Sequence, residues 1–236
     1  MSKVRLISLG VYALLTITLT AAILGGTVTV TAQQAALQQL GEQFQKQYDA
    51  ILAVFANGPA RRVFPPDPRD RVRQWQNELA SSFAEAGATI DEILKLNPPQ
   101  SERWRELRET LTLYSQRISP PQSRTVYGSS EVKKRARLLE SPAATYPEQA
   151  RAAEADGEVR LRLVFAADGT VKHVFPMKAL KYGLTEAAME AARQIKFAPA
   201  IRDDQPVSQF ATLVYEFKKG KDKSRPPYFP VSEFYF

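Results

Sequence analysis

The side chains that most often carry out chemistry in proteins are sparse in this sequence. Its 236 residues include one histidine, His173, and no cysteine. These counts exclude a metal site built from several histidines, a thiolate metal site, a disulfide and a cysteine nucleophile. A serine hydrolase would depend on His173 alone. That residue lies in phase with Val171 and Phe175 in an alternating pattern, which indicates a partly packed strand residue rather than a catalytic one.

The other groups capable of catalysis do not form a recognisable constellation. Asp91 and Glu92 are adjacent in a helical pattern and therefore point in different directions. Gly25-Gly26 lies in an apolar segment and not in a phosphate-binding loop. We therefore predict no catalytic residue, no metal ligand and no cofactor, and we expect a protein that is not an enzyme. A hydrolase that uses His173 is the enzymatic alternative.

The first 32 residues have the pattern of an export signal. Lys3 and Arg5 precede a long uncharged stretch that is rich in apolar residues. One alternative is a secretory signal peptide that is cleaved after Ala32. The other is a retained anchor from Leu6 to Val30, which as a helix would be about 37 Å long and could span a bilayer. Both alternatives place the rest of the chain outside the cytoplasm.

Residues 33–118 have the periodicity of amphipathic helices. Apolar residues recur every three or four positions in three runs, which are separated by proline-containing segments. The stripes are Leu37, Leu40, Phe44, Tyr48, Ile51 and Phe55; Val72, Trp75, Leu79, Phe83, Ala86, Ile90 and Ile93; and Trp104, Leu107, Leu111, Tyr114 and Ile118. The pattern predicts an α-helical domain, either a helical hairpin or a three-helix bundle, that could self-associate.

The pattern changes after a linker at residues 119–132. A short alanine-rich helix is followed by a strand that alternates from Val159 to Phe165, and the Asp168-Gly169 pair predicts a hairpin turn. A small-residue helix from Leu184 to Ile195 and a last strand complete this part. We therefore predict an α+β fold, in which a small three-stranded antiparallel sheet carries two helices on one face. Residues 219–236 form a basic and aromatic tail.

The second half of the chain resembles a known family, the C-terminal domain of TonB, a periplasmic energy transducer. The resemblance covers about residues 133–218 and depends on the order and spacing of several short motifs. The motif residues are Tyr146, Pro147, Gly157, Asp168, Gly169, Phe197 and Pro199. Family members bind a short extended segment of an outer-membrane transporter by adding it as a strand to an exposed sheet edge.

The resemblance implies a partner-binding edge in the last strand, between residues 207 and 217. The residues expected to form this edge are Val207, Gln209, Ala211, Leu213, Val214, Tyr215 and Phe217. The implied partner is a cell-envelope protein such as a TonB-dependent outer-membrane transporter. An open edge invites aggregation, so the alternative is that the chain's own tail or a second copy covers it.

Two departures from the family affect the functional prediction. The chain has a helical domain in place of a long proline-rich spacer, and residues 6–32 contain no histidine that could couple to a proton channel. We therefore predict a TonB-like envelope protein that binds a partner by β-strand addition, with energy-coupled transport as an extension of that role. The alternative is a self-associating periplasmic scaffold. The basic run Lys133–Arg137 lacks interleaved aromatic residues, so no nucleic-acid partner is expected.

Overall fold

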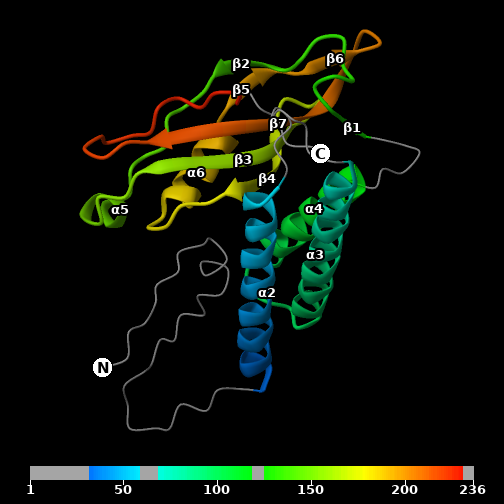
Figure 1. Cartoon of the computed structure of the whole chain (residues 1–236), viewed down its shortest axis with the longest axis vertical. Helices are drawn as coiled ribbons and strands as arrows, with labels where there is room; N and C mark the ends of the chain where they lie inside the picture. Colours follow the sequence, from blue (N-terminus) through cyan, green and yellow to red (C-terminus); the bar gives the residue numbers. More distant parts are fainter. Residues whose placement is uncertain (1–31, 59–68, 119–124, 231–236) are drawn as a thin grey trace.

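The computed structural model describes residues 32–58, 69–118 and 125–230 (Figure 1). The predicted signal peptide or anchor therefore lies outside the described residues, apart from Ala32. Parts of the predicted linker and tail, residues 119–124 and 231–236, also lie outside them. No helix within the described ranges combines the length and the apolar character needed to cross a membrane.

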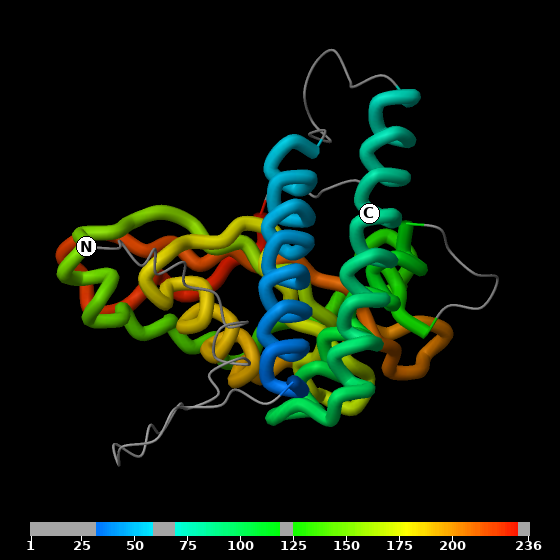
Figure 2. The backbone as a smooth tube through the Cα atoms, turned by 90° about the horizontal axis from the view of Figure 1, so that it is seen from below, coloured from blue at the N-terminus to red at the C-terminus, as the bar shows by residue number. Residues whose placement is uncertain are grey.

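Three long helices form the N-terminal region, as the periodicity predicted. They are α2 (Ala32–Ala56), α3 (Arg69–Lys95) and α4 (Ser101–Ile118). The predicted apolar stripes face inward, and most of their residues are buried. α3 packs against both α2 and α4, and Figure 2 shows α2 and α3 running side by side. The two prolines at 98 and 99 separate α3 from α4, because proline lacks the amide hydrogen that a continuous helix requires.

The C-terminal half contains a mixed sheet that is larger than predicted. Its strands are β1 (Val126–Tyr127), β3 (Gly157–Phe165), β4 (Val171–Lys178), β6 (Ala200–Arg202) and β7 (Gln205–Phe217). The order is β1-β7-β3-β4, with β6 paired to β7. The expected antiparallel strands β3, β4 and β7 are present. The prediction of a three-stranded sheet was incomplete because β1 and β6 are too short to show an alternating pattern.

A second, two-stranded sheet and two helices complete this half. The sheet pairs β2 (Arg137–Glu140) with β5 (Lys196–Ala198), and the helices are α5 (Glu148–Ala152) and α6 (Leu184–Arg193). Buried residues of both helices belong to one hydrophobic cluster with the inward side chains of β3 and β7. α6 lies against β3 and β4 on this side of the main sheet, and Ala150 of α5 joins the same cluster.

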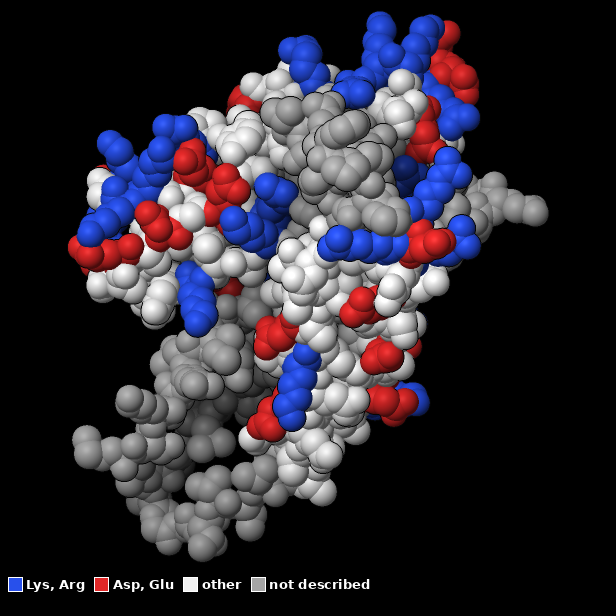
Figure 3. All heavy atoms as spheres, viewed as in Figure 1, with Lys and Arg blue, Asp and Glu red and all other residues white. Residues whose placement is uncertain are grey.

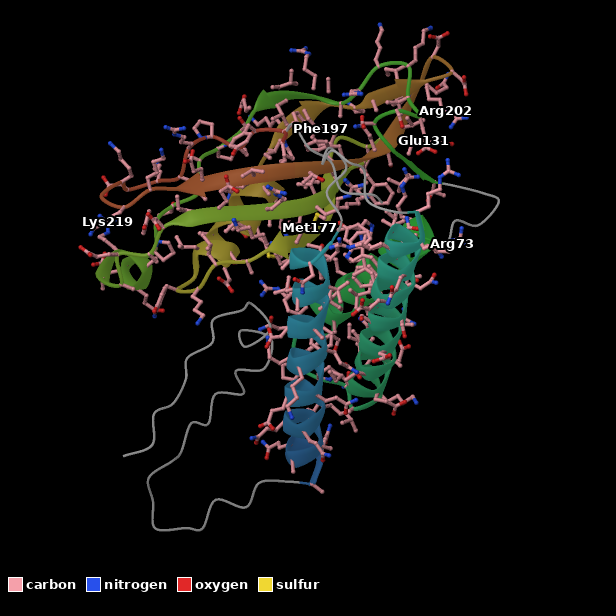
Figure 4. All side chains as sticks on the ribbon, viewed as in Figure 1. Arg73, Glu131, Met177, Phe197, Arg202 and Lys219 are labelled. Carbon is pink, nitrogen blue, oxygen red and sulfur yellow. The ribbon has the colours of Figure 1, made fainter. Side chains whose placement is uncertain are left out.

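The opposite face of the sheet packs against the helical region. Phe175 on β4 is fully buried, and its ring lies 5.4–6.2 Å from those of Tyr48, Phe55, Phe83 and Tyr114, measured between centroids. Met177, labelled in Figure 4, belongs to the same cluster where β4 meets the helices. One continuous core thus joins the helices to the sheet. The domain boundaries placed at 118 and 133 remain a prediction, and this core extends across them.

Candidate partner-binding edge

The only histidine has structural contacts. The backbone carbonyl of His173 accepts a hydrogen bond from the Tyr114 hydroxyl (2.5 Å). Its Nδ1 lies 3.1 Å from Oγ1 of Thr110, which donates its own proton to the carbonyl of Glu106 (2.7 Å). Nδ1 must therefore be the donor to Thr110. Within the described residues no group of three or more acidic, histidine or cysteine side chains could hold a metal ion.

Three of the motif residues shape the start of the sheet. Tyr146 is buried, donates its hydroxyl to the carbonyl of Ala155, and places its ring edge-on against Phe217, with centroids 5.7 Å apart. Pro147 is the N-cap of α5. Gly157 begins β3 with φ of +133°, and a Cβ there would approach Leu180 Cδ2 to 3.1 Å. These residues connect α5 to β3 and seat both against the end of β7.

The remaining motif residues form the turn after β3 and the region before β7. In the β3–β4 turn, Gly169 has φ of +84°, and its amide donates to the carbonyl of Ala166 (3.0 Å). Hydrogen bonds from Lys172 and Thr170 hold the pKa of Asp168 well below its usual range. Phe197 on β5 packs against Phe165 with ring centroids 4.3 Å apart, and Pro199 separates β5 from β6. Each of the seven motif residues thus contributes to a turn, to the boundary of a helix or strand, or to packing of the core.

β7 lies inside the sheet and not at its rim, which corrects the predicted edge. It pairs with β3 along its length, from Gly157 opposite Phe217 to Phe165 opposite Gln209. Alternate residues of a strand direct their backbone groups to opposite neighbours. Since Val214 bonds to the other side, the odd-numbered residues face β3 or, at Val207, β6. These residues are Val207, Gln209, Ala211, Leu213, Tyr215 and Phe217. Of the predicted edge residues, Val214 alone offers its backbone to the outer side.

The chain's own tail covers the outer side of β7 at Val214 and Glu216. The Val214 amide donates to the Tyr228 carbonyl (2.9 Å), the Tyr228 amide donates to the Val214 carbonyl (3.2 Å), and the Arg225 amide donates to the Glu216 carbonyl (2.9 Å). Pro226 and Pro227, between these contacts, have no amide hydrogen to donate. The tail is therefore a short added strand with three backbone hydrogen bonds to β7 within the described residues.

The tail is attached more firmly just before it reaches β7. The Tyr146 amide donates to the Asp222 carbonyl (2.9 Å), and the Ser224 amide donates to the Ala144 carbonyl (2.8 Å). Asp222 also pairs with Arg151 at 2.7 Å. Residues 222–224 thus stay on the segment that precedes α5, whereas residues 225–228 hold the edge of β7.

At the other end of its outer side, β7 pairs with β1. Val126 lies opposite Ser208 and Tyr127 opposite Gln209 in parallel register. Between β1 and the tail is Thr212, whose backbone has no strand opposite it on this side in the part of the chain that the structure describes. Two short segments therefore occupy the two ends of the edge that we expected to be open.

Charged side chains flank the tail. Arg225 Nη1 lies 3.0 Å from one carboxylate oxygen of Glu216, and Lys218 Nζ lies 3.3 Å from the other. Glu158 on β3 is directly opposite Glu216. Acidic and basic side chains are interspersed at this end of the sheet, near the Lys219 turn labelled in Figure 4, as Figure 3 shows. The edge is therefore polar around an otherwise buried strand.

Sequence reasoning missed Thr212, Glu216, Arg225 and Tyr228 as edge residues. Strand periodicity identifies β7, but it cannot say which neighbour each backbone group faces. The tail has two consecutive prolines and no alternation, so it gave no strand signal. The sequence offered the tail only as an alternative cover for the edge, without identifying the residues that pair.

Comparison with known proteins agrees with the resemblance seen in the sequence. Residues 142–218 match the family model of the C-terminal region of the Gram-negative bacterial TonB protein, a family that is not enzymatic. The solution NMR structure of the Pseudomonas aeruginosa TonB C-terminal domain matches with 18% identity and a TM-score of 0.34, and the match covers 42% of this chain and 98% of that one. A search of curated proteins found no relative. Residues 142–218 of this chain therefore match the TonB C-terminal domain family.

Proposed function

We propose that this protein is an envelope binding module that captures an extended segment of a partner protein as an added strand on the outer side of β7. The observation that carries the proposal is the tail, which already occupies this position through backbone hydrogen bonds at Val214 and Glu216. Backbone pairing makes few demands on sequence, so another extended segment can form the same bonds.

The contacts of the tail suit exchange with a partner. Each backbone hydrogen bond contributes about 1 kcal/mol net, and three of them join residues 225–228 to β7. The side chains of Arg225, Tyr228 and Phe229 are exposed. A partner segment without prolines could form more backbone bonds than the tail and displace it.

The family supports a periplasmic location and an outer-membrane transporter as the partner. The matched region is that of a Gram-negative bacterial TonB protein, and a transporter segment that faces the periplasm would supply the extended strand. Energy transduction is a further role that the family implies. The shared core through Phe175 favours a fixed attachment of the sheet to the helices, in contrast to a long proline-rich spacer that holds two parts of a chain apart.

Peptide titration of the isotope-labelled full chain, observed by NMR, tests the proposal. The probes are synthetic ten-residue peptides copied from periplasm-facing segments of outer-membrane transporters of the same bacterium. We expect a binding peptide to shift the amide signals of Val214 and Glu216 and to accelerate hydrogen exchange at the Tyr228 amide. Binding that leaves these three amides unchanged would refute strand addition at β7.

One variant and a pair of N-methylated peptides separate loss of the edge from loss of the fold. Val214→Pro removes the outward-facing amide and should abolish peptide binding while circular dichroism stays native. On the peptide, N-methylation of a residue that faces β7 should abolish binding, whereas N-methylation of the next residue should not. Equal binding of both methylated peptides would contradict the proposal.

A further inference from the structure

The tail occupies the edge of β7, so its side-chain contacts indicate what a partner segment would meet there. Its cationic contribution is Arg225, which is 3.0 Å from Oε2 of Glu216. The other oxygen, Oε1, pairs with Lys218 at 3.3 Å. Lys218 directly follows β7 and remains in place when the tail leaves. Departure of the tail therefore frees Oε2 of Glu216 and leaves Oε1 paired.

A carboxylate on the neighbouring strand makes an unpaired Oε2 of Glu216 unfavourable. Glu158 on β3 lies directly opposite Glu216, and like charges in directly opposed positions destabilise a sheet. Cations near Glu158 are looser, since Arg160 and Lys178 lie 3.8 and 3.7 Å away. Arg225, at 3.0 Å, is thus the nearest of these four cations to the opposed carboxylates, of which Glu216 is partly buried with 24% of its side chain exposed.

We propose that the segment captured at β7 carries a basic side chain in the register position of Arg225, opposite Glu216. This inference depends on the strand-addition function proposed above and specifies its ligand: an extended basic peptide. Backbone bonds provide attachment in any register, whereas the ion pair with Glu216 selects one register and rejects an acidic residue there. The tail meets the same requirement and so competes with the partner.

Tyr228, three residues after Arg225, also lies beside the acidic side chains at this end of the edge. Burial and then the carboxylates of Glu158 and Glu216 raise the pKa of Tyr228. The direction of this shift agrees with a net negative surrounding at this end of the edge, although Arg160 acts the other way. An acidic partner residue at this end of the edge would meet the same repulsion.

A reciprocal charge exchange tests the inference with the full chain. Arg225→Glu and Glu216→Lys each place like charges at the tail contact, so each variant opens the edge. The probes are two synthetic peptides of residues 222–230, one with the native sequence and one with Arg225→Glu. We expect the Arg225→Glu chain to bind the native peptide about five- to ten-fold more tightly than the acidic peptide, and the Glu216→Lys chain to show the reverse preference.

A matched control and the Val214 signal separate the possible failures. The control adds Glu154→Lys to the Arg225→Glu chain. Glu154 is an exposed acidic residue outside the edge, and it pairs with Lys219 at 2.6 Å. The added substitution should leave the preference for the native peptide unchanged. Equal affinities of both peptides for both opened chains would overturn the basic-residue requirement and leave strand addition intact. No binding by either peptide, while rapid exchange at the Val214 amide shows an open edge, would overturn strand addition itself.

Discussion

The two long sides of the main sheet are closed in different ways. On the β4 side, α2 and α4 pack against the strand, Pro176 removes an amide, and Tyr114 binds the carbonyl of His173. His173 adopts φ of +53°, which distorts the strand further. On the β7 side, the tail supplies three backbone bonds and largely exposed side chains, and β1 adds a short parallel pairing through two half-buried residues. One side is closed by the core and the other by a removable strand.

This difference locates the side on which a foreign strand can add. Opening the β4 side requires separating aromatic rings of four helical residues from Phe175, with loss of buried apolar area. Opening the β7 side requires breaking three backbone bonds and an exposed ion pair. Proteins protect sheet edges against unwanted pairing, and here the protection is permanent on one side and exchangeable on the other.

The largest contrast is expected from two phenylalanines, one on each side. Phe175→Ala removes a fully buried ring from the joint core and should lower the free energy of unfolding by about 3–5 kcal/mol. Phe229→Ala removes a ring that is 45% exposed on the tail and should change it by less than about 1 kcal/mol. Urea unfolding of the full chain measures both, and similar losses would show that the two sides are closed equally firmly.

The next contrast concerns two tyrosine hydroxyls. Tyr114→Phe removes the donor to the His173 carbonyl and should cost about 1–2 kcal/mol, because a buried acceptor loses its partner. Tyr215→Phe is the control, since its buried hydroxyl has no hydrogen-bond partner in the described part of the chain. That substitution should be neutral or slightly stabilising, and a larger loss than that of Tyr114→Phe would mean that Tyr114 does not fasten β4.

Much of the fold followed from local patterns in the sequence. The apolar stripes of α2, α3 and α4 have a period set by their own residues, and the alternation in β3 and β7 likewise depends on one buried face. The β3–β4 turn was predictable because Asp168-Gly169 favours a tight reversal. The TonB-like region was predictable because its motifs recur in a defined order.

The arrangement around β7 could not be predicted in the same way. Whether a strand is interior depends on segments distant in sequence, and Tyr228 reaches Val214 through contacts that no local pattern encodes. Phe175 and Phe210 were expected to be sheet residues, but nothing local indicates that they join the helical core. The pairing of Glu216 with Arg225 likewise became visible only when the tail was placed.

A smaller effect on stability is expected from the tail itself. Tyr228→Pro removes one of the two backbone bonds to Val214, so hydrogen exchange at the Val214 amide should accelerate about ten-fold while the free energy of unfolding changes by less than about 1 kcal/mol. Tyr228→Ala retains the amide and should leave the exchange rate nearly unchanged. Equal acceleration by both variants would mean that side-chain packing, not backbone pairing, holds the tail.

The smallest predicted effect is a pH dependence on the β4 side. Burial lowers the pKa of His173 below its ordinary value of 6.5, more than the carboxylates of Glu106 and Glu109 raise it, and Lys172 lowers it further. The unfolded chain therefore takes up a proton near pH 6.5 before the folded chain does, and stability is lost as the pH falls from about 7.5 through that range.

The variant His173→Asn isolates the contribution of His173 to the pH dependence of stability, because asparagine tolerates positive φ and does not titrate. As this is the only histidine of the chain, the difference between the pH profiles of the native chain and the variant reports one group. The native chain should lose more of its unfolding free energy than the variant between pH 7.5 and 5. Parallel stability profiles of the native chain and the variant would contradict this prediction. They would show that the imidazole is protonated equally well in the folded chain, and hence that the α4–β4 contact does not bury it.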